Sequence, residues 1–116
     1  MKTIWPSDAI AFQEEGATVP FVRYTQEGIH FIGFDSRACV PPEPMVNAML
    51  ALVHIKNPQT KVVMINHRSP VGLLAKIGEC YSIDQEELEN SAVRLTFSYK
   101  EGATQHADLS SSHCAG

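Results

Sequence analysis

One stretch decides the fold: Phe34-Asp35-Ser36-Arg37-Ala38-Cys39-Val40-Pro41-Pro42-Glu43-Pro44. An aromatic and β-branched run ends at Asp35, and the prolines that follow make a turn from which a helix begins at about Glu43. A helix that starts in such a turn directs unpaired backbone N–H groups at whatever lies in front of it. We therefore expect this turn to mark the functional end of the molecule.

The residues before this junction predict a hairpin. Residues 19–24 and 29–34 are rich in aromatic and β-branched side chains, and Gln26-Glu27-Gly28 lies between them as a glycine turn. Pro20 has no backbone N–H, so we expect the first of these strands at a sheet edge. Further upstream, Ser7 and Gly16 bracket a segment that we interpret as a small helix or an irregular arm.

The residues after the junction predict two helices and three strands. Residues 43–56 keep apolar side chains at the spacing of a helix, namely Met45, Met49, Leu52 and Val53. Residues 61–66 form a continuous apolar run, which is typical of a strand buried on both sides. Ser69 and Pro70 begin a second helix that ends at Gly78. Residues 81–85 predict a short strand, and the alternation over 93–99 predicts the last one.

These elements predict an α/β fold, a two-layer sandwich with a βαβαββ core. Two helices pack on one face of a mixed four-stranded sheet, and an N-terminal strand is added at its edge. We divide the chain into an N-terminal arm and edge strand (1–28), a core domain (29–102) and a C-terminal tail (103–116). The tail has no apolar periodicity, so we expect it to be disordered.

Composition excludes two classes of partner. Nine Lys and Arg against thirteen Asp and Glu give a formal net charge of −4, with no basic cluster, so no nucleic acid is expected. The first residues hold no apolar run, and no segment is long enough to span a bilayer, so we expect neither a signal peptide nor a membrane anchor. Three widely spaced cysteines argue against a disulfide framework. We expect a cytoplasmic protein.

The junction resembles that of the TusA-like (SirA-like) sulfur-carrier family, small proteins with the same succession of strands and helices. In that family Leu-Asp-x-x-Gly-Leu ends a strand and Cys-Pro-x-Pro begins a helix; here 34–39 stand at the strand end and 42–44 match Pro-x-Pro. A closer resemblance is to an uncharacterised bacterial domain family related to these carriers, with Pro-Pro-Glu-Pro at the helix start and His-Arg-x-Pro after the second strand. Both strings occur here, at 41–44 and 67–70.

The resemblance covers roughly residues 29–100 and implies a TusA-like fold in a sulfur or redox setting. The family's cysteine carries a persulfide, but the matching position here is Pro41, which cannot carry sulfur, and Ala38 stands where the family has glycine. The comparison therefore favours a non-catalytic binding module without a cofactor. The alternative is a sulfur-carrier or sulfurtransferase-like protein in which Cys39 is a displaced persulfide thiol.

In such a fold the loops before the two helices lie at the same end of neighbouring strands. We predict a site for a small anion or a protein partner there, because two helix N-termini and two arginines favour negative charge. Its residues are Asp35, Arg37, Pro41, Pro42, Glu43, His67 and Arg68. In an alternative interpretation Asp35 pairs with Arg37, Glu43 caps the helix and His67 fills a strand end.

Other chemistry has less support in the sequence. His106, His113 and Cys114 are metal-compatible, but their spacing matches no standard site, so no metal is expected. The first helix is broadly apolar, which indicates either a partner, such as a second copy of the chain, or an N-terminal arm that folds back over it with Trp5, Ile10 and Phe12.

Overall fold

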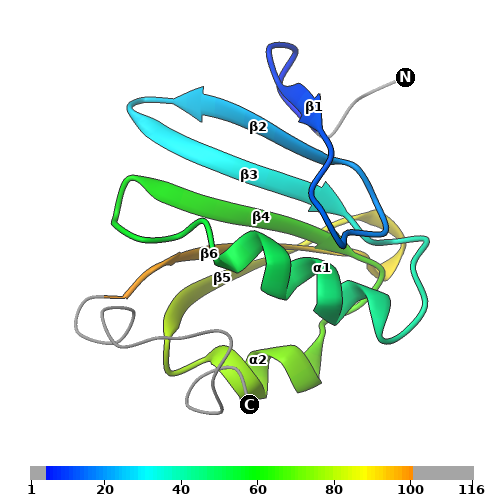
Figure 1. Cartoon of the computed structure of the whole chain (residues 1–116). Helices are drawn as coiled ribbons and strands as arrows, with labels where there is room; N and C mark the ends of the chain where they lie inside the picture. The colour runs from blue at the N-terminus through cyan, green and yellow to red at the C-terminus, as the bar shows by residue number, and fades with distance from the viewer. Residues whose placement is uncertain (1–4, 101–116) are drawn as a thin grey trace.

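The computed structural model describes residues 5–100, which form one six-stranded mixed sheet with two helices on one face (Figure 1). Along the chain the elements are β1 (Ile10–Phe12), β2 (Phe21–Gln26), β3 (Ile29–Asp35), α1 (Glu43–Leu52), β4 (Thr60–Asn66), α2 (Val71–Ile77), β5 (Tyr81–Glu87), the 3₁₀ turn η1 (Glu89–Ser91) and β6 (Val93–Tyr99). The strand order is β1-β2-β3-β4-β6-β5. Only β3 and β4 are parallel neighbours within this sheet.

The mixed sheet and the two helices agree with the prediction, but the strand number does not. The sheet has six strands rather than four plus one, because the segment predicted as a small helix or arm contains β1. From β3 onward the elements follow the predicted succession of strand, helix, strand, helix, strand, strand, with η1 inserted before the last. The predicted topology is therefore matched in part.

Because β1 pairs with β2, β2 is not the edge strand of the sheet. Phe12 pairs with Phe21 in the antiparallel register, and the two rings meet edge to face with centroids 5.9 Å apart. Pro20 precedes β2 instead of interrupting it. The predicted edge position of this strand was wrong, since a three-residue strand is too short to show a period-two pattern.

The hairpin between β2 and β3 is confirmed. Its two-residue turn is Glu27-Gly28, and both residues have positive φ, at 51° and 81°. That geometry matches the twist of the flanking strands, and glycine adopts it without steric strain.

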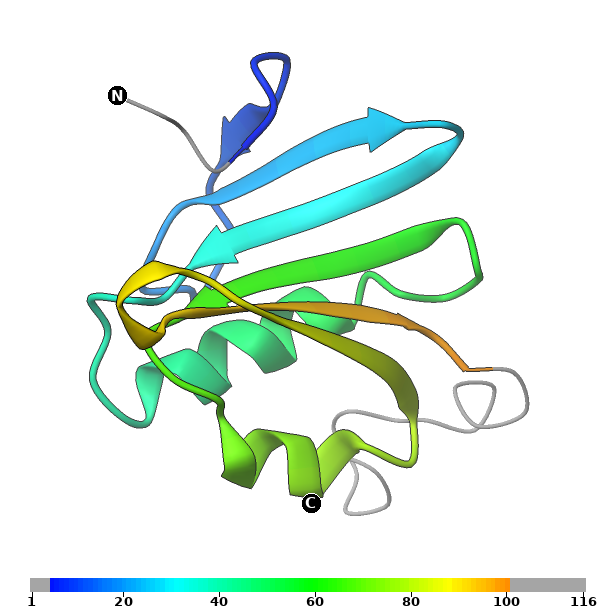
Figure 2. The ribbon, with the colours of Figure 1, turned by 180° about the vertical axis from the view of Figure 1, so that it is seen from behind.

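The core lies between the helices and one face of the sheet. Central strand β4 is buried on both sides, as predicted: Val62 and Met64 join the core under the helices, whereas Val63 and Ile65 face the other way. Figure 2 shows the strands in front of α1, so this second face carries no helix. On it Trp5 packs over Gly33, and the ring of Tyr24 stacks on that of Phe31 with centroids 5.0 Å apart.

The buried face of helix α1 overlaps the predicted one only in part, at Leu52. Its buried side chains are Pro44, Asn47, Ala48, Ala51 and Leu52. Val53 is exposed, and Met45 and Met49 are only partly buried. Small alanines let the helix approach the sheet closely. The N-terminal arm meets the helix where Gly16 lies next to the Leu50 side chain, and Glu14 is hydrogen-bonded at 2.7 Å to His54, just past the helix end. The arm thus accounts for part of the apolar surface on α1. Phe12 packs against the core, Ile10 is exposed, and Trp5 lies on the opposite face of the sheet.

Neither helix within residues 5–100 is long and apolar enough to cross a membrane.

Candidate functional site

The candidate site lies where β3 and β4 end. Because the two strands are parallel, their carboxyl ends meet at one edge of the sheet. Ser36, which is fully buried, links the two strand ends by hydrogen bonds. Its backbone N–H donates to the Ile65 carbonyl at 2.7 Å. Its hydroxyl lies 2.9 Å from the same carbonyl and 2.8 Å from Asn66 Oδ1. Asn66 Nδ2 in turn donates to the Arg68 carbonyl at 2.9 Å. This network fixes the loop that leads to α2.

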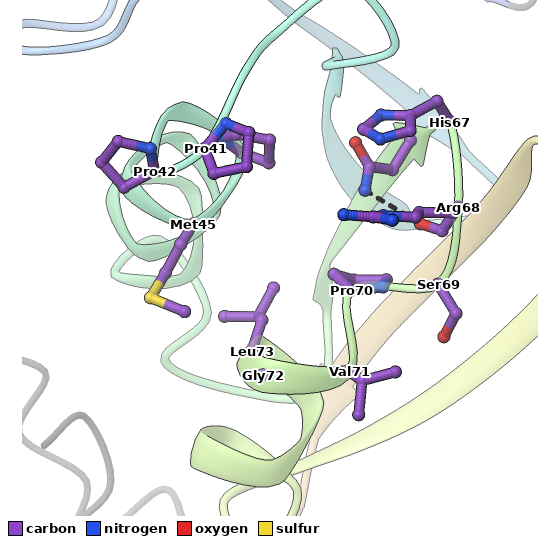
Figure 3. Close-up of a pocket in the computed structure, with 12 residues that line it drawn as sticks. Pro41, Pro42, Met45, His67, Arg68, Ser69, Pro70, Val71, Gly72 and Leu73 are labelled. Carbon is purple, nitrogen blue, oxygen red and sulfur yellow. Dashed lines mark hydrogen bonds between the residues drawn. The ribbon is translucent and has the colours of Figure 1, made fainter.

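A pocket of about 460 Å³ opens between the start of α1 and this loop (Figure 3). Its lining comes from two segments that both contain prolines. One wall is Pro41, Pro42, Pro44 and Met45; the other is Asn66, His67, Arg68, Ser69, Pro70, Val71, Gly72 and Leu73. The pocket therefore joins the two motifs at 41–44 and 67–70.

Two side chains of this pocket, His67 and Arg68, have nitrogen atoms without a protein partner in the described part of the chain. His67 Nδ1 is buried and makes no hydrogen bond, and the Arg68 guanidinium takes no part in the ion pairs found within residues 5–100. Figure 3 shows the His67 ring and the Arg68 side chain directed toward the space between the walls. No Asp or Glu lines the pocket. The pocket can therefore receive a negatively charged group, and no lining carboxylate would repel that group.

The other polar side chains of the pocket are already occupied. Ser69 Oγ donates to Gln85 Oε1 at 3.0 Å, and Asn66 is held by Ser36 and by the Arg68 carbonyl. Ser69 was predicted to cap α2, but the N-cap is Pro70, without a side-chain hydrogen bond. The hydroxyl of Ser69 instead joins the loop to β5.

Asp35 and Arg37, both predicted as site residues, pair with each other and do not line the pocket. Arg37 Nη2 lies 2.7 Å from Asp35 Oδ2, and Arg37 Nε and its backbone N–H each donate to Asp35 Oδ1 at 3.0 Å. Burial of the carboxyl group acts to raise the pKa of Asp35, but the hydrogen bonds and charge of Arg37 outweigh it and hold that pKa below its ordinary value. Because of this pair, the Arg37 guanidinium is not free to bind a ligand.

Glu43 faces the N-terminal arm rather than the pocket. Its carboxylate accepts a hydrogen bond of 3.2 Å from the Thr18 hydroxyl. Of the seven predicted site residues, the pocket thus brings together Pro41, Pro42, His67 and Arg68. For Asp35 and Arg37 the alternative interpretation, pairing with each other, describes the contacts better, whereas Glu43 neither lines the pocket nor caps α1 as that interpretation expected.

Cys39 is the free cysteine of the described part, and its side chain is buried, with 8% of the residue exposed. Burial raises the pKa of its thiol, the carboxylates of Glu43 and Asp35 act in the same direction, and a hydrogen bond from Thr18 opposes them. Its Sγ lies 4.0 Å from Asn47 Nδ2, beneath α1. A thiol of this kind is protonated and shielded near neutral pH.

Comparison with known proteins adds no relative. No protein family, curated protein or solved structure matches the chain. Residues 5–100 hold no group of three or more His, Cys, Asp or Glu side chains arranged to bind a metal ion. The candidate ligands His106, His113 and Cys114 and the predicted disordered tail lie outside the described residues.

Proposed function

We propose that this protein is a non-catalytic binding module and that a small anion binds in the pocket between α1 and the loop before α2. One observation carries the proposal: the His67 ring and the Arg68 guanidinium line a pocket without acidic residues, and within residues 5–100 neither His67 Nδ1 nor that guanidinium has a partner.

The energetic argument is that a buried polar atom is almost always hydrogen-bonded in a folded protein. Leaving one unpaired costs on the order of 1–3 kcal/mol, which a bound acceptor removes. His67 Nδ1 is such an atom, and in the tautomer that carries the ring proton on Nδ1 it would donate a hydrogen bond to an anion. An anion would also neutralise Arg68, whose planar guanidinium can donate two parallel hydrogen bonds to a carboxylate or phosphate.

The TusA-like resemblance and a sulfur or redox setting remain part of this proposal. The succession of elements after β3 and the Pro-x-Pro at the start of α1 support the family assignment. The sulfur-carrier alternative has less support, because Pro41 cannot form a persulfide and Cys39 is buried with a raised pKa. The predicted cytoplasmic location stays a prediction.

Titration of the isotope-labelled protein with acetate and with inorganic phosphate, followed by NMR, tests this function. We expect shift changes confined to residues 41–45 and 66–73. His67→Ala and Arg68→Ala should each weaken binding about tenfold, the loss expected for one hydrogen bond to a charged group. The matched control is Arg94→Ala, since Arg94 pairs with Glu86 on the sheet and does not line the pocket.

The function is refuted if neither anion changes the pocket resonances, or if Arg94→Ala weakens binding as much as Arg68→Ala does. Shift changes confined to the strand faces would place the anion outside the pocket and refute this site.

A further inference from the structure

We further propose that the anion is the carboxylate of a small organic acid whose apolar body fills the pocket. This inference rests on the proposed function and adds the class of ligand. It follows from three features: the walls of the pocket, the number of free donors and the position of Gly72.

The walls of the pocket are mainly apolar. Eight of the twelve lining residues have no polar side-chain atom: Pro41, Pro42, Pro44, Met45, Pro70, Val71, Gly72 and Leu73. An inorganic anion would leave these surfaces in contact with water, whereas an apolar body would bury them. The volume of about 460 Å³ lies toward the small end of ligand pockets, which suits a small organic acid.

The number of free donors matches one carboxylate. With Asn66 and Ser69 occupied, His67 and Arg68 are the lining side chains left to meet a ligand within the described chain. Two residues at the start of α2 add no backbone donor: Pro70 has no N–H, and the Val71 N–H donates to the Ser69 carbonyl at 3.0 Å. Phosphate sites usually surround the oxygens with several backbone N–H groups. A carboxylate needs only the fork of one arginine and one further donor.

Gly72 gives access to the apolar part of the pocket without touching the donors. A Cβ placed on Gly72 would have one neighbour within 4 Å, the terminal methyl of Met45 at 4.0 Å on the opposite wall. A larger side chain at position 72 would therefore extend into the pocket. Gly72 lies inside α2, where leucine favours the helix more than glycine does. Gly72→Leu should thus fill the apolar part and keep the protein folded.

The experiment measures affinity for the series acetate, propionate, butyrate and pentanoate by NMR titration. Each added methylene should tighten binding about fourfold until the pocket is full. Butylammonium, with the same body and opposite charge, should not bind, and inorganic phosphate should bind more weakly than pentanoate. In Gly72→Leu the gain with chain length should disappear while acetate still binds; Ala75→Leu, an exposed position on the same helix, is the control that should keep it.

Equal affinity for acetate and pentanoate in the unaltered protein would overturn this inference and leave the anion site standing. Phosphate binding more tightly than pentanoate would do the same. If no member of the series and no phosphate bound at all, the proposed function itself would fail. The chain-length series uses only the unaltered protein, so the inference is testable whether or not Gly72→Leu folds.

Discussion

Replacing Gly33 by alanine tests the packing of the N-terminal segment on the helix-free face of the sheet. A Cβ built on Gly33 would lie 2.6 Å and 2.7 Å from two carbons of the Trp5 ring. Carbon atoms in contact are separated by about 3.5 Å, so the ring must withdraw by about 1 Å or leave the site. Gly33 is buried at the middle of the sheet, paired with Val22 and Val63, so the strand itself cannot yield.

The expected loss of stability is about 1–3 kcal/mol, the usual effect of adding a carbon to a filled site. Its upper bound is set by Trp5: once the ring has left, the clash is gone and the loss is that of the ring's own burial and contacts, such as the one with the Tyr24 ring. For a domain of this size each kcal/mol lowers the melting temperature by roughly 4–8 °C. Trp5 is the only tryptophan in the chain, so its fluorescence reports the displacement directly.

The assay is chemical denaturation of four proteins: the unaltered chain, Gly33→Ala, Trp5→Ala and the double variant. If the clash with Trp5 causes the loss, alanine at position 33 should be harmless or slightly stabilising once Trp5 is absent, because glycine weakens strands. Circular dichroism follows all four unfolding transitions, and the emission maximum of Gly33→Ala should shift to the red.

An equal loss from Gly33→Ala with and without Trp5 would refute this packing. So would an unchanged emission maximum in Gly33→Ala, since the ring could not then have moved.

Two further predictions concern side chains beneath α1. Asn47→Ala should destabilise the protein by about 1–3 kcal/mol in denaturation, because the Thr18 N–H then loses its acceptor, Asn47 Oδ1, at 2.9 Å. The control is Val46→Ala at an exposed position of the same helix, which should change stability by about 0.5 kcal/mol or less. Equal losses in the two variants would contradict the role given to Asn47. Cys39 should be alkylated far more slowly than an exposed thiol near pH 7, as measured by peptide mapping. Since burial raises the pKa of its thiol, its reactivity should appear only at higher pH or on unfolding; a fast reaction would restore the sulfur-carrier alternative.

The sequence predicts the strands best where one face is buried and the other meets solvent. Val93, Leu95 and Phe97 alternate with polar residues and are all buried, as expected for β6. The buried face of α1 was predicted correctly at Leu52 but not at Asn47, Ala48 and Ala51, because hydrophobicity ranks Met and Val above Asn and Ala, whereas close packing selects small side chains. Asn47 is fully buried because the arm supplies Thr18 as its partner, and no local pattern reveals that contact.

The sequence predicts where the site lies, but it does not predict which residues line it. Two proline-rich helix starts after parallel strands predict that Pro41 and His67 come together, and they line one pocket. Whether Arg37 or Arg68 points into it depends on side-chain direction. Arg37 pairs with the Asp35 carboxylate two residues before it, whereas Arg68 has no acidic neighbour in its loop. The apolar residues Met45 and Val71 were missed, because in sequence they read only as parts of helices.

The order of strands has a consequence for how copies of this chain meet. One border of the sheet is β1, only three residues long. The other is β5, where Asp84, Glu86 and Glu87 are exposed. If two copies extended the sheet through β5, carboxylates would lie beside carboxylates, and β1 offers too few hydrogen bonds to hold a neighbour. Within residues 5–100 both borders thus act against edge-to-edge aggregation, which favours a face of the molecule over a sheet edge as the place where two copies would meet.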